Sequence, residues 1–481
     1  MNGKSIIRRL TAVLLCAVML FCTLCAPAYA ANGAAEEEKN YTADCPYIKV
    51  LGLMSTDIYV DKSDPSSGTV WPPQTGIVIK DVLKLLPSLF ELAITKNYSR
   101  FGEKLYAAVY DIFSPLYMYG TGEVQNKSGT IFTYPEPEKI KKDSYLIFEY
   151  DWRLDPIELA AQLNDFINYV LECSGSEEVV LECHSYGGVV TYTYLNNYGT
   201  EKVRSVAFNA AAVYGTAFVG EICKGKVVLS DEGAVEYLKS VWAYSDAEKL
   251  LNGLTGVLYK TGVLGWLCDK VNNIARGLGK DAMANCILPM FGSWPSIWSM
   301  VSDECYDDAY NHIFNEICPE YNLDYSALQK KVDNYTNTIR VNRQSILKNI
   351  NENCNLYVLA RYGFCTVFIV ENWKIQGDMA VDLRYSSFGA SVLPYGEKSE
   401  KSGRYISPDG DIDASTCLFP EQTWFLDNAT HIPTFRCMHD WFARLLYFDG
   451  QATVDTFEDS PQFLFYNENS GTFTADRRII D

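Results

Sequence analysis

The stretch that decides the fold is 179-VVLECHSYGGVV-190. Its first half is an apolar run that predicts a buried strand, and the run leads into a small-x-Ser-x-Gly turn centred on Ser185. A helix is expected from Gly188 to about Tyr198, ended by Gly199. This order of strand, serine turn and helix is typical of a nucleophile elbow, in which a strained backbone lifts the hydroxyl to the carboxyl end of the sheet.

Two other interpretations of the same stretch remain open. One is an ordinary strand-to-helix turn with a buried serine. The other is that Cys183 is the nucleophile, although it lies on the strand and not at the apex of the turn. Cysteine also stands where an elbow usually has glycine, and it is small enough for the helix to cross close to the strand.

Further apolar runs on both sides of the elbow predict buried parallel strands. They are Tyr47–Leu51, Tyr145–Tyr150, Val203–Asn209 and Leu356–Ala360. Before the elbow strand, Asp155 and Pro156 are expected to begin an amphipathic helix that continues to about Leu171. Strands that alternate with helices predict an α/β fold of the α/β-hydrolase type, with a mostly parallel sheet flanked by helices.

The alternation stops after the run at Val203. Helical periodicity and aromatic side chains dominate residues 213–344, which predicts a helical cap or lid inserted into the sheet domain. A separately folding domain is the alternative. The sheet domain is then expected over residues 45–212 and 345–450, followed by a C-terminal extension over 451–481. A smaller insertion between residues 80 and 142 contains a very apolar helix from Val82 to Leu92, either a core helix or a lipid contact.

The first thirty residues have the pattern of a cleaved signal peptide. Lys4, Arg8 and Arg9 precede an apolar run of 15 residues, Leu10–Leu24, and an A-x-A site ends at Ala30. The run is shorter than the ~20 residues that span a bilayer, which disfavours a membrane anchor. We therefore expect a secreted or extracytoplasmic protein, with a flexible leader over residues 31–44.

Charge and cysteine content exclude several function classes. The formal net charge is -19, and it becomes -22 when the three signal-peptide cations are removed (-19 minus 3). This acidity disfavours nucleic acid as a partner. Fifteen cysteines occur, of which twelve follow residue 30, and none of the twelve forms a CxxC pair or a Cys/His cluster with zinc spacing. We expect no metal and no cofactor.

A serine nucleophile needs a base, and the chain has four histidines. His184 adjoins the serine, so its ring is expected to point away, and His312 lies in the expected cap. In this fold the chain order is serine, acid, histidine, which leaves His431 and His439. His431 lies in a loop between a strand-like run and the next helix, so we predict it as the base. His439 falls inside that helix and is the alternative.

The acid is expected on an earlier loop, and 407-SPDGDID-413 offers three aspartates. An apolar residue three positions after the acid commonly anchors such a loop, and Ile412 fits Asp409. We predict Asp409 as the acid, with Asp411 and Asp413 as alternatives. A solvated acidic turn is another interpretation, and so is a D-x-D-x-D calcium loop, although the glycine and glutamate of an EF-hand are missing downstream.

The developing oxyanion also needs hydrogen-bond donors. One is expected to be the backbone N–H of Tyr186, directly after the serine. The second is expected from the loop after the first strand, 52-GLMST-56, at Leu53 or Met54.

Taken together, these motifs resemble those of the lecithin:cholesterol acyltransferase-like lipases. Residues 150-YDWR-153 are similar to the family's YDWR signature, 50-VLGLMS-55 to its PG-(I/L/F)-MG-S oxyanion loop, and 184-HSYG-187 to its HSMG. Trp71-Pro72, Tyr362-Gly363 and 409-DGDI-412 resemble its tryptophan-proline pair, its YG and the DGTV of its GDGTVP acid loop. The sequence departs from the family at Leu51, Ser55, Cys183 and Pro408.

The resemblance covers most of the chain from Tyr47 to Phe448. It implies an α/β-hydrolase core with a helical cap and activity on phospholipid or other lipid esters, with acyl transfer to an alcohol in some members. It also implies transient lipid-surface contact through the 80–142 insertion or the cap. The rival functions are a catalytically inactive binding protein on the same fold, and a peptidase or amidase. No oligomeric state is specified.

Overall fold

The computed structural model describes residues 42–73, 84–85, 87–88, 91–242, 248–432, 436–467 and 470–476. The expected signal peptide and most of the leader lie outside the described residues. The apolar helix expected from Val82 to Leu92 also lies mainly outside them.

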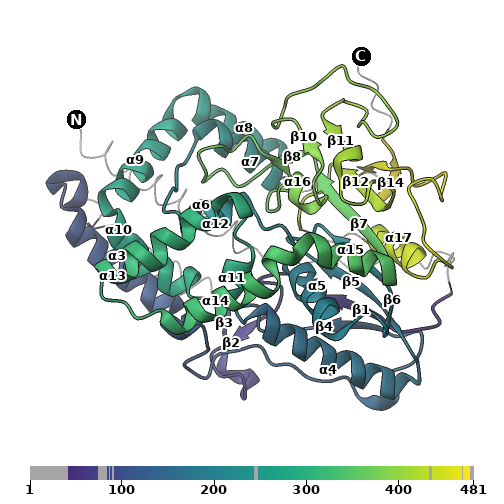
Figure 1. Ribbon diagram of the computed structural model, residues 1–481. Helices are drawn as coiled ribbons and strands as arrows, with labels where there is room; N and C mark the ends of the chain where they lie inside the picture. The colour runs from purple at the N-terminus through teal and green to yellow at the C-terminus, as the bar shows by residue number, and fades with distance from the viewer. Residues whose placement is uncertain are drawn as a thin grey trace.

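An eight-stranded sheet forms the centre of the molecule, in the order β14-β13-β12-β7-β6-β5-β1-β4 (Figure 1). Its strands are β1 (Tyr47–Val50), β4 (Tyr145–Phe148), β5 (Val179–His184), β6 (Val203–Asn209), β7 (Asn355–Tyr362), β12 (Thr423–Asp427), β13 (Phe463–Asn467) and β14 (Thr472–Ala475). Every neighbouring pair is parallel except β13 with β14. The predicted α/β fold with a mostly parallel sheet is confirmed, and each of the five apolar runs forms a strand.

The sheet extends further along the chain than expected. Strands β13 and β14 come from residues 451–481, which the sequence pattern assigns to an extension beyond the core. Leu464 of β13 is fully buried and packs in the same cluster as Trp424 of β12. The C-terminal segment is therefore part of the sheet.

Helices cover both faces of the sheet. On one face, α4 (Pro156–Ser174), α5 (Tyr186–Tyr198) and α15 (Arg343–Asn353) share a core cluster with Ile48, Leu181 and Val358. On the other, α17 (Arg436–Leu446) shares a cluster with Val180 and Leu359. Alternate residues of each strand thus face opposite helix layers, as expected for a buried parallel sheet.

The predicted start of α4 is confirmed. The Asp155 carboxylate accepts a hydrogen bond of 2.9 Å from the Ile157 amide, and Pro156 occupies the first turn. The helix ends at Gly175, which has a left-handed backbone (φ 65°).

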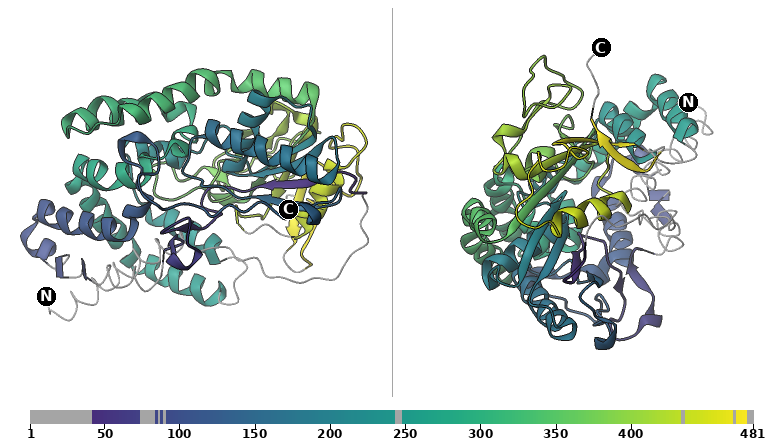
Figure 2. Two further views of the ribbon diagram at one scale, coloured as in Figure 1. Left: turned by 90° about the horizontal axis from the view of Figure 1, so that it is seen from below. Right: turned by 90° about the vertical axis from the view of Figure 1, so that its right-hand side faces the viewer.

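Between β6 and β7, the described residues form helices and no strand of the main sheet. These elements are α6 (Ala217–Cys223), α7 (Asp231–Trp242), α8 (Glu248–Lys260), α9 (Val263–Leu278), α10 (Lys280–Ala282), the π-helix η5 (Met283–Gly292), α11 (Pro295–Ser299), α12 (Asp303–Tyr310), the π-helix η6 (Asn311–Ile317), α13 (Cys318–Glu320), α14 (Ser326–Thr338) and η7 (Arg340–Asn342). Figures 1 and 2 show most of them gathered beyond one end of the sheet.

The smaller insertion joins this helical layer. Its helix α3 (Tyr98–Phe113) packs against α9, and Phe101 and Leu278 are buried against each other there. The remaining short elements are β2 (Ile58–Tyr59), η1 (Pro65–Ser67), β3 (Thr69–Trp71), η2 (Ser114–Leu116), η3 (Tyr119–Thr121), η4 (Pro137–Lys139), β8 (Phe364–Cys365), β9 (Gln376–Gly377), α16 (Leu383–Ser386), β10 (Ser391–Val392), β11 (Ile412–Asp413), η8 (Ala414–Thr416) and η9 (Pro420–Gln422).

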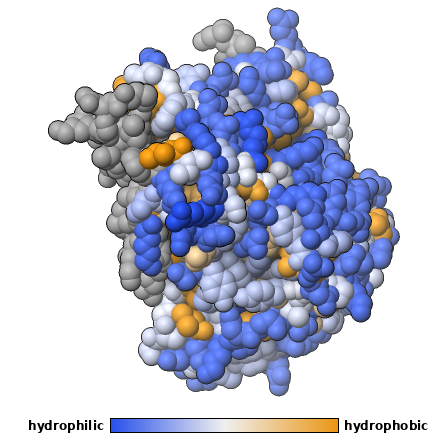
Figure 3. Space-filling model, turned by 90° about the vertical axis from the view of Figure 1, so that its left-hand side faces the viewer, coloured by the Kyte–Doolittle hydropathy of each residue, from blue (hydrophilic) through white to orange (hydrophobic). Residues whose placement is uncertain are grey.

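The outer face of the helical layer is mostly hydrophilic, with scattered hydrophobic patches (Figure 3). Within the ranges given above, no helix is both long and apolar enough to cross a membrane.

Candidate active site

Ser185 occupies the expected turn between β5 and α5. Its backbone has φ 56° and ψ -124°, a conformation that is strained for a residue with a side chain. Backbone hydrogen bonds hold the turn on both sides: Ser185 N–H donates to the Asn209 carbonyl (3.2 Å), and the amides of Gly188 and Ala212 donate to the Ser185 carbonyl (3.0 Å each). The side chain is mostly enclosed, with 8% of the residue exposed. These features are the geometry of a nucleophile elbow.

Both glycines after the serine are required by close packing. A Cβ on Gly187 would lie 2.4 Å from the carbonyl oxygens of Val50 and Leu51, and a Cβ on Gly188 would lie 2.5 Å from the Ala211 Cβ. Any larger residue would push α5 away from the sheet and move Ser185 with it.

Cys183 faces the protein interior. Its side chain is completely buried, and the thiol donates to the Ala207 carbonyl over 3.4 Å. Burial raises the pKa of this thiol above its usual value, so the reactive thiolate is disfavoured. The geometry therefore gives no support to Cys183 as nucleophile.

His431 follows β12 and is hydrogen-bonded to Asp378. Its Nδ1 lies 2.7 Å from Asp378 Oδ2, and because a carboxylate can only accept, Nδ1 carries the proton. The backbone joins the same pair, since His431 N–H donates to the Asp378 carbonyl (2.7 Å). The second carboxylate oxygen accepts from the amides of Ala380 (3.1 Å) and Val381 (2.8 Å). Asp378 is fully buried, so these bonds hold its carboxylate in one orientation.

The sequence-based choice of Asp409 as the partner of this histidine is corrected by these contacts. The Ser407 hydroxyl oxygen lies 2.7 Å from a carboxylate oxygen of Asp409 and 2.7 Å from one of Asp411, so its single proton is shared between them. The two aspartates line a separate cavity of about 650 Å³ whose walls include neither Ser185 nor His431. Burial and the neighbouring Asp409 raise the pKa of Asp411 to about 7.

Asp413, the third aspartate of this loop, is not at the site either. Its carboxylate accepts a hydrogen bond from the amide of Ser415 (3.1 Å) and caps a short helical turn. Across the part of the chain that the structure describes, no group of three or more His, Cys, Asp or Glu side chains could hold a metal ion, so the calcium-loop interpretation gains no support.

A signal for Asp378 was present in the sequence. Residues 377-GDMAV-381 match the family's GDGTV at the glycine, the aspartate and the valine. Met379, which stands at the second glycine, has a left-handed backbone (φ 84°) that favours glycine. Because methionine replaces that glycine, the sequence pattern does not identify the turn. Val381 is buried and anchors the loop.

His184 connects the elbow to the histidine loop. Its ring centroid lies 4.6 Å from that of His431, and its Nε2 donates to the His431 carbonyl (3.2 Å). Burial lowers the pKa of His184 well below its usual value, and the positive charges of Arg361 and Lys49 add to this effect, so the ring stays neutral. The ring thus faces His431, whereas the sequence suggested that it points away from the site.

The remaining two histidines lie elsewhere. His439, on α17, packs edge-on against the rings of Tyr47 (5.0 Å) and Tyr145 (4.8 Å). His312 lies in η6, with its Nδ1 3.3 Å from Glu316.

The expected oxyanion loop lies against the elbow. A Cβ on Gly52 would come within 2.8 Å of the Ser185 Cβ and 3.3 Å of the His184 carbonyl oxygen, so the loop packs directly against the elbow at a position that has no room for a side chain. Leu53 and Met54 follow directly, and Met54 takes a left-handed conformation (φ 60°). The Trp71 indole N–H donates to the Met54 carbonyl over 3.0 Å and holds this turn.

The YDWR segment braces the same loop. Tyr150 donates its hydroxyl proton to the Leu51 carbonyl, and the Trp152 indole donates to the Thr56 carbonyl (3.0 Å). Arg153 forms a buried ion pair with Asp151 (2.6 Å). The loop is therefore fixed at both ends by side chains of one motif.

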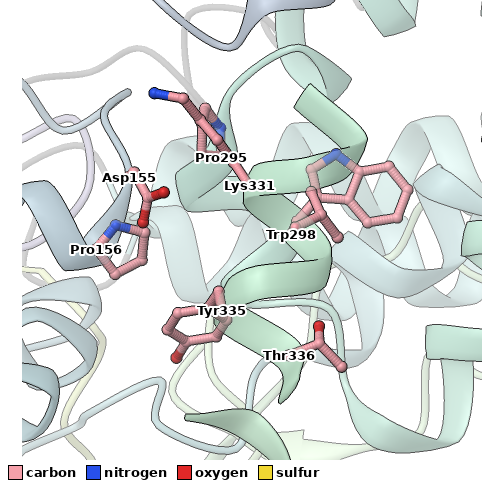
Figure 4. A pocket seen from close by; sticks show the side chains of 8 residues that line it. Asp155, Pro156, Pro295, Trp298, Lys331, Tyr335 and Thr336 are labelled. Atoms are coloured by element: carbon pink, nitrogen blue, oxygen red, sulfur yellow. The ribbon is translucent and has the colours of Figure 1, made fainter. Parts of the chain in front are cut away.

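A narrow gap between α4, α11 and α14, too small to hold a water molecule, is a different feature (Figure 4). Asp155, Trp298, Lys331 and Tyr335 line it, and none of the candidate residues does. Lys331 pairs there with Glu158 over 2.5 Å. We regard this space as a packing gap between the core and the helical layer.

Among solved structures, the chain has a weak likeness to a chain of "The crystal structure of Tle4-Tli4 complex", with 18% identity and a TM-score of 0.22. That alignment covers 38% of this chain and 48% of the other, so this chain spans about half of its length. No curated protein matches.

The family model of lecithin:cholesterol acyltransferase matches residues 140–364. The matched segment contains the YDWR motif and the Ser185 elbow, and it ends before Asp378 and His431. The resemblance that the motifs indicated is thereby confirmed over residues 140–364, where the chain is similar to the lecithin:cholesterol acyltransferase family.

Proposed function

We propose that this protein is an exported serine esterase or acyltransferase that acts on lipid or other carboxylic esters. The family match supports acyltransferase or esterase activity on lipid substrates. The observation that carries the proposal is the buried hydrogen bond of 2.7 Å between His431 and Asp378, on a loop that contacts the strained Ser185 turn through His184.

In the proposed reaction, Ser185 Oγ attacks the ester carbonyl while His431 Nε2 takes its proton. The tetrahedral intermediate then expels the alcohol, which receives that proton, and an acyl-serine remains. Water or a second alcohol attacks this ester, again with His431 as base, and the proton returns to the serine as the acid or the new ester leaves. Asp378 keeps Nδ1 protonated throughout and stabilises the imidazolium.

The oxyanion of each intermediate would be bound by backbone amides. The Tyr186 N–H is the first of α5, where the helix dipole also favours negative charge. Leu53 or Met54 would provide the second donor. The contact of Gly52 with Ser185 supports this role, because it sets the loop directly beside the reacting carbonyl.

A fluorophosphonate probe tests the nucleophile. We expect the wild-type protein to be labelled and the Ser185→Ala variant not to be. His431→Ala should also abolish labelling and p-nitrophenyl ester hydrolysis, whereas His439→Ala is a matched control that should retain both. Labelling that survives in Ser185→Ala would contradict the proposal, and an unlabelled wild-type protein would favour the inactive binding protein.

Three further measurements define the substrate, the bond that is cleaved and the location. Lipid profiling after incubation with mixed lipids, comparing wild type with Ser185→Ala, should identify the ester that disappears and the product that forms. Faster turnover of amide analogues than of esters would favour a peptidase. Mass spectrometry of the mature protein should find an N-terminus after Ala30 if the signal pattern is cleaved.

A further inference from the structure

A row of buried polar side chains crosses the sheet beneath the candidate site. Lys49 of β1, Glu182 of β5, Asn209 of β6 and Arg361 of β7 are all buried. Glu182 lies 3.1 Å from the Lys49 ammonium and accepts from the Asn209 amide (2.9 Å). Asn209 in turn accepts from Arg361 Nε (3.1 Å) and Nη2 (2.7 Å). Four strands are thus connected by one chain of hydrogen bonds.

The position of this row in the sheet is unusual for charged residues. On each of the four strands, the residue two positions earlier is buried, apolar and on the face that α17 covers. These earlier residues are Tyr47, Val180, Ala207 and Leu359. Glu182 and Arg361 have no exposed surface. Buried ion pairs can often be replaced by apolar side chains without loss of stability, so stability alone is a weak reason for this row.

The row ends at the histidine loop. Arg361 Nη1 donates to the carbonyls of Thr430 (3.0 Å) and His431 (2.9 Å). One rigid guanidinium therefore joins the sheet to two consecutive peptide groups of the loop that carries the candidate base. Ile432, the next residue, is half exposed.

The contacts of residue 431 now form a complete set of restraints. Its N–H and Nδ1 bind Asp378, and its carbonyl receives hydrogen bonds from Arg361 and His184. With the backbone held on both sides and one ring nitrogen engaged, the second nitrogen, Nε2, is confined to one direction.

We propose that Arg361 is a positioning residue for His431, held in place by Asn209, which itself donates to Glu182, so that the imidazole is aligned before substrate binds. This inference rests on the proposed function, because it assigns the aligned ring to Ser185 chemistry. Misplacement of a catalytic group by about 1 Å can lower a rate about 100-fold.

The test compares two buried arginines. Arg361→Lys keeps the charge but cannot reach Asn209 and both carbonyls at once. Arg340→Lys is the matched control, because Arg340 is also buried and donates to two carbonyls, those of Val301 (2.7 Å) and Trp298 (2.6 Å), in the helical layer. We expect Arg361→Lys to lower kcat for ester hydrolysis and the rate of probe labelling by about 100-fold with little change in KM, and Arg340→Lys to change neither.

A second readout does not depend on activity. The Nδ1 proton of His431, hydrogen-bonded to a buried carboxylate, should give a low-field proton NMR signal that is absent from His431→Ala. This signal should shift or broaden in Arg361→Lys and stay unchanged in Arg340→Lys. If Arg361→Lys does not fold, as judged by its melting curve, Asn209→Ala replaces it, since it removes the support of the guanidinium and leaves its charge.

The outcomes separate the two proposals. A folded Arg361→Lys variant with wild-type rates and an unchanged signal would overturn the positioning role. The fluorophosphonate probe could also fail to label even the wild-type protein while the Nδ1 proton signal still shifts in Arg361→Lys. That result would overturn the proposed function alone, and the role of Arg361 in orienting the ring would stand.

Discussion

Two loops at the carboxyl edge of the sheet carry an aspartate followed by a residue with left-handed backbone. Met379 (φ 84°) follows Asp378, and Gly410 (φ 73°) follows Asp409. In each loop the third residue after the aspartate is apolar and buried. The two loops therefore have nearly the same local structure, yet of the two aspartates only Asp378 is hydrogen-bonded to His431.

The difference lies in what surrounds each carboxylate. Asp378 is enclosed and receives two amides of its own loop and the imidazole. Asp409 shares the Ser407 hydroxyl with Asp411 and borders a cavity of about 650 Å³. A short acidic motif thus identifies a loop shape, and the long-range contacts decide which loop serves the histidine.

The largest expected effect comes from exchanging carboxylate for amide in each loop. Asp378→Asn should lower kcat for ester hydrolysis by about 10⁴-fold, because an amide can donate to Nδ1 and favour the wrong tautomer. Asp409→Asn, the matched change, should leave kcat nearly unchanged. Steady-state kinetics of the two purified variants provides the measurement. Equal losses in both, or a loss confined to Asp409→Asn, would restore the sequence-based assignment.

The second effect concerns the glycine of the Asp409 loop. A Cβ on Gly410 would lie 2.2 Å from the Ser399 carbonyl oxygen, in addition to the strain of its left-handed backbone. Gly410→Ala should therefore lower the free energy of unfolding by about 2–3 kcal/mol, measured by urea denaturation. The ester kcat of the folded variant should stay near wild type, since this loop does not contact His431. A strong loss of kcat at unchanged stability would mean that the two loops are coupled.

The third effect is a pH dependence that belongs to the Asp409 loop. The pKa of Asp411 is raised from an ordinary value of 3.8 to about 7 by burial and by Asp409. Between these values the folded protein holds a proton that the unfolded chain has lost, so this group's contribution to stability is present at low pH and is lost as the pH rises through about 7.

The stability of the Asp411→Asn variant should fall less than that of wild type as the pH rises. Unfolding free energies at pH 5 and pH 7.5 should differ less in the variant than in wild type, by an amount of the order of 2 kcal/mol. Burial also raises the pKa values of Asp155 and Asp382 to about 6, so the variant keeps a smaller decline of the same sign. A decline identical to wild type would show that Asp411 is ionised in the folded state.

Sequence patterns predicted the fold well where burial is continuous. The five apolar runs became strands because parallel strands covered on both faces consist almost wholly of apolar residues. Strand β14 was missed because it is short and partly exposed, with every second residue facing solvent. Its neighbour β13 was missed with it, and both lie in the segment that the sequence pattern assigns to an extension beyond the core.

The site was predictable only in its local parts. The Ser185 turn has a backbone signature that spans a few residues, and His431 follows from chain order. Asp378 was overlooked because Met379 stands where a glycine would mark the turn. Arg361 was overlooked for another reason: its partner Asn209 lies on a strand 152 residues away in sequence, and the register of the two strands is a property of the assembled sheet.

The smallest expected effect tests why Met379 is tolerated. Met379→Gly removes the strain of a left-handed residue with a side chain, about 1 kcal/mol, but it loses some packing and gives the unfolded chain more freedom. Because these terms oppose each other, the free energy of unfolding should change by less than about 1 kcal/mol, and the ester kcat should be retained. Urea denaturation of Met379→Gly beside Gly410→Ala makes the comparison. A loss as large as that of Gly410→Ala would show that the methionine side chain, and not the shape of the backbone, holds the Asp378 loop against His431.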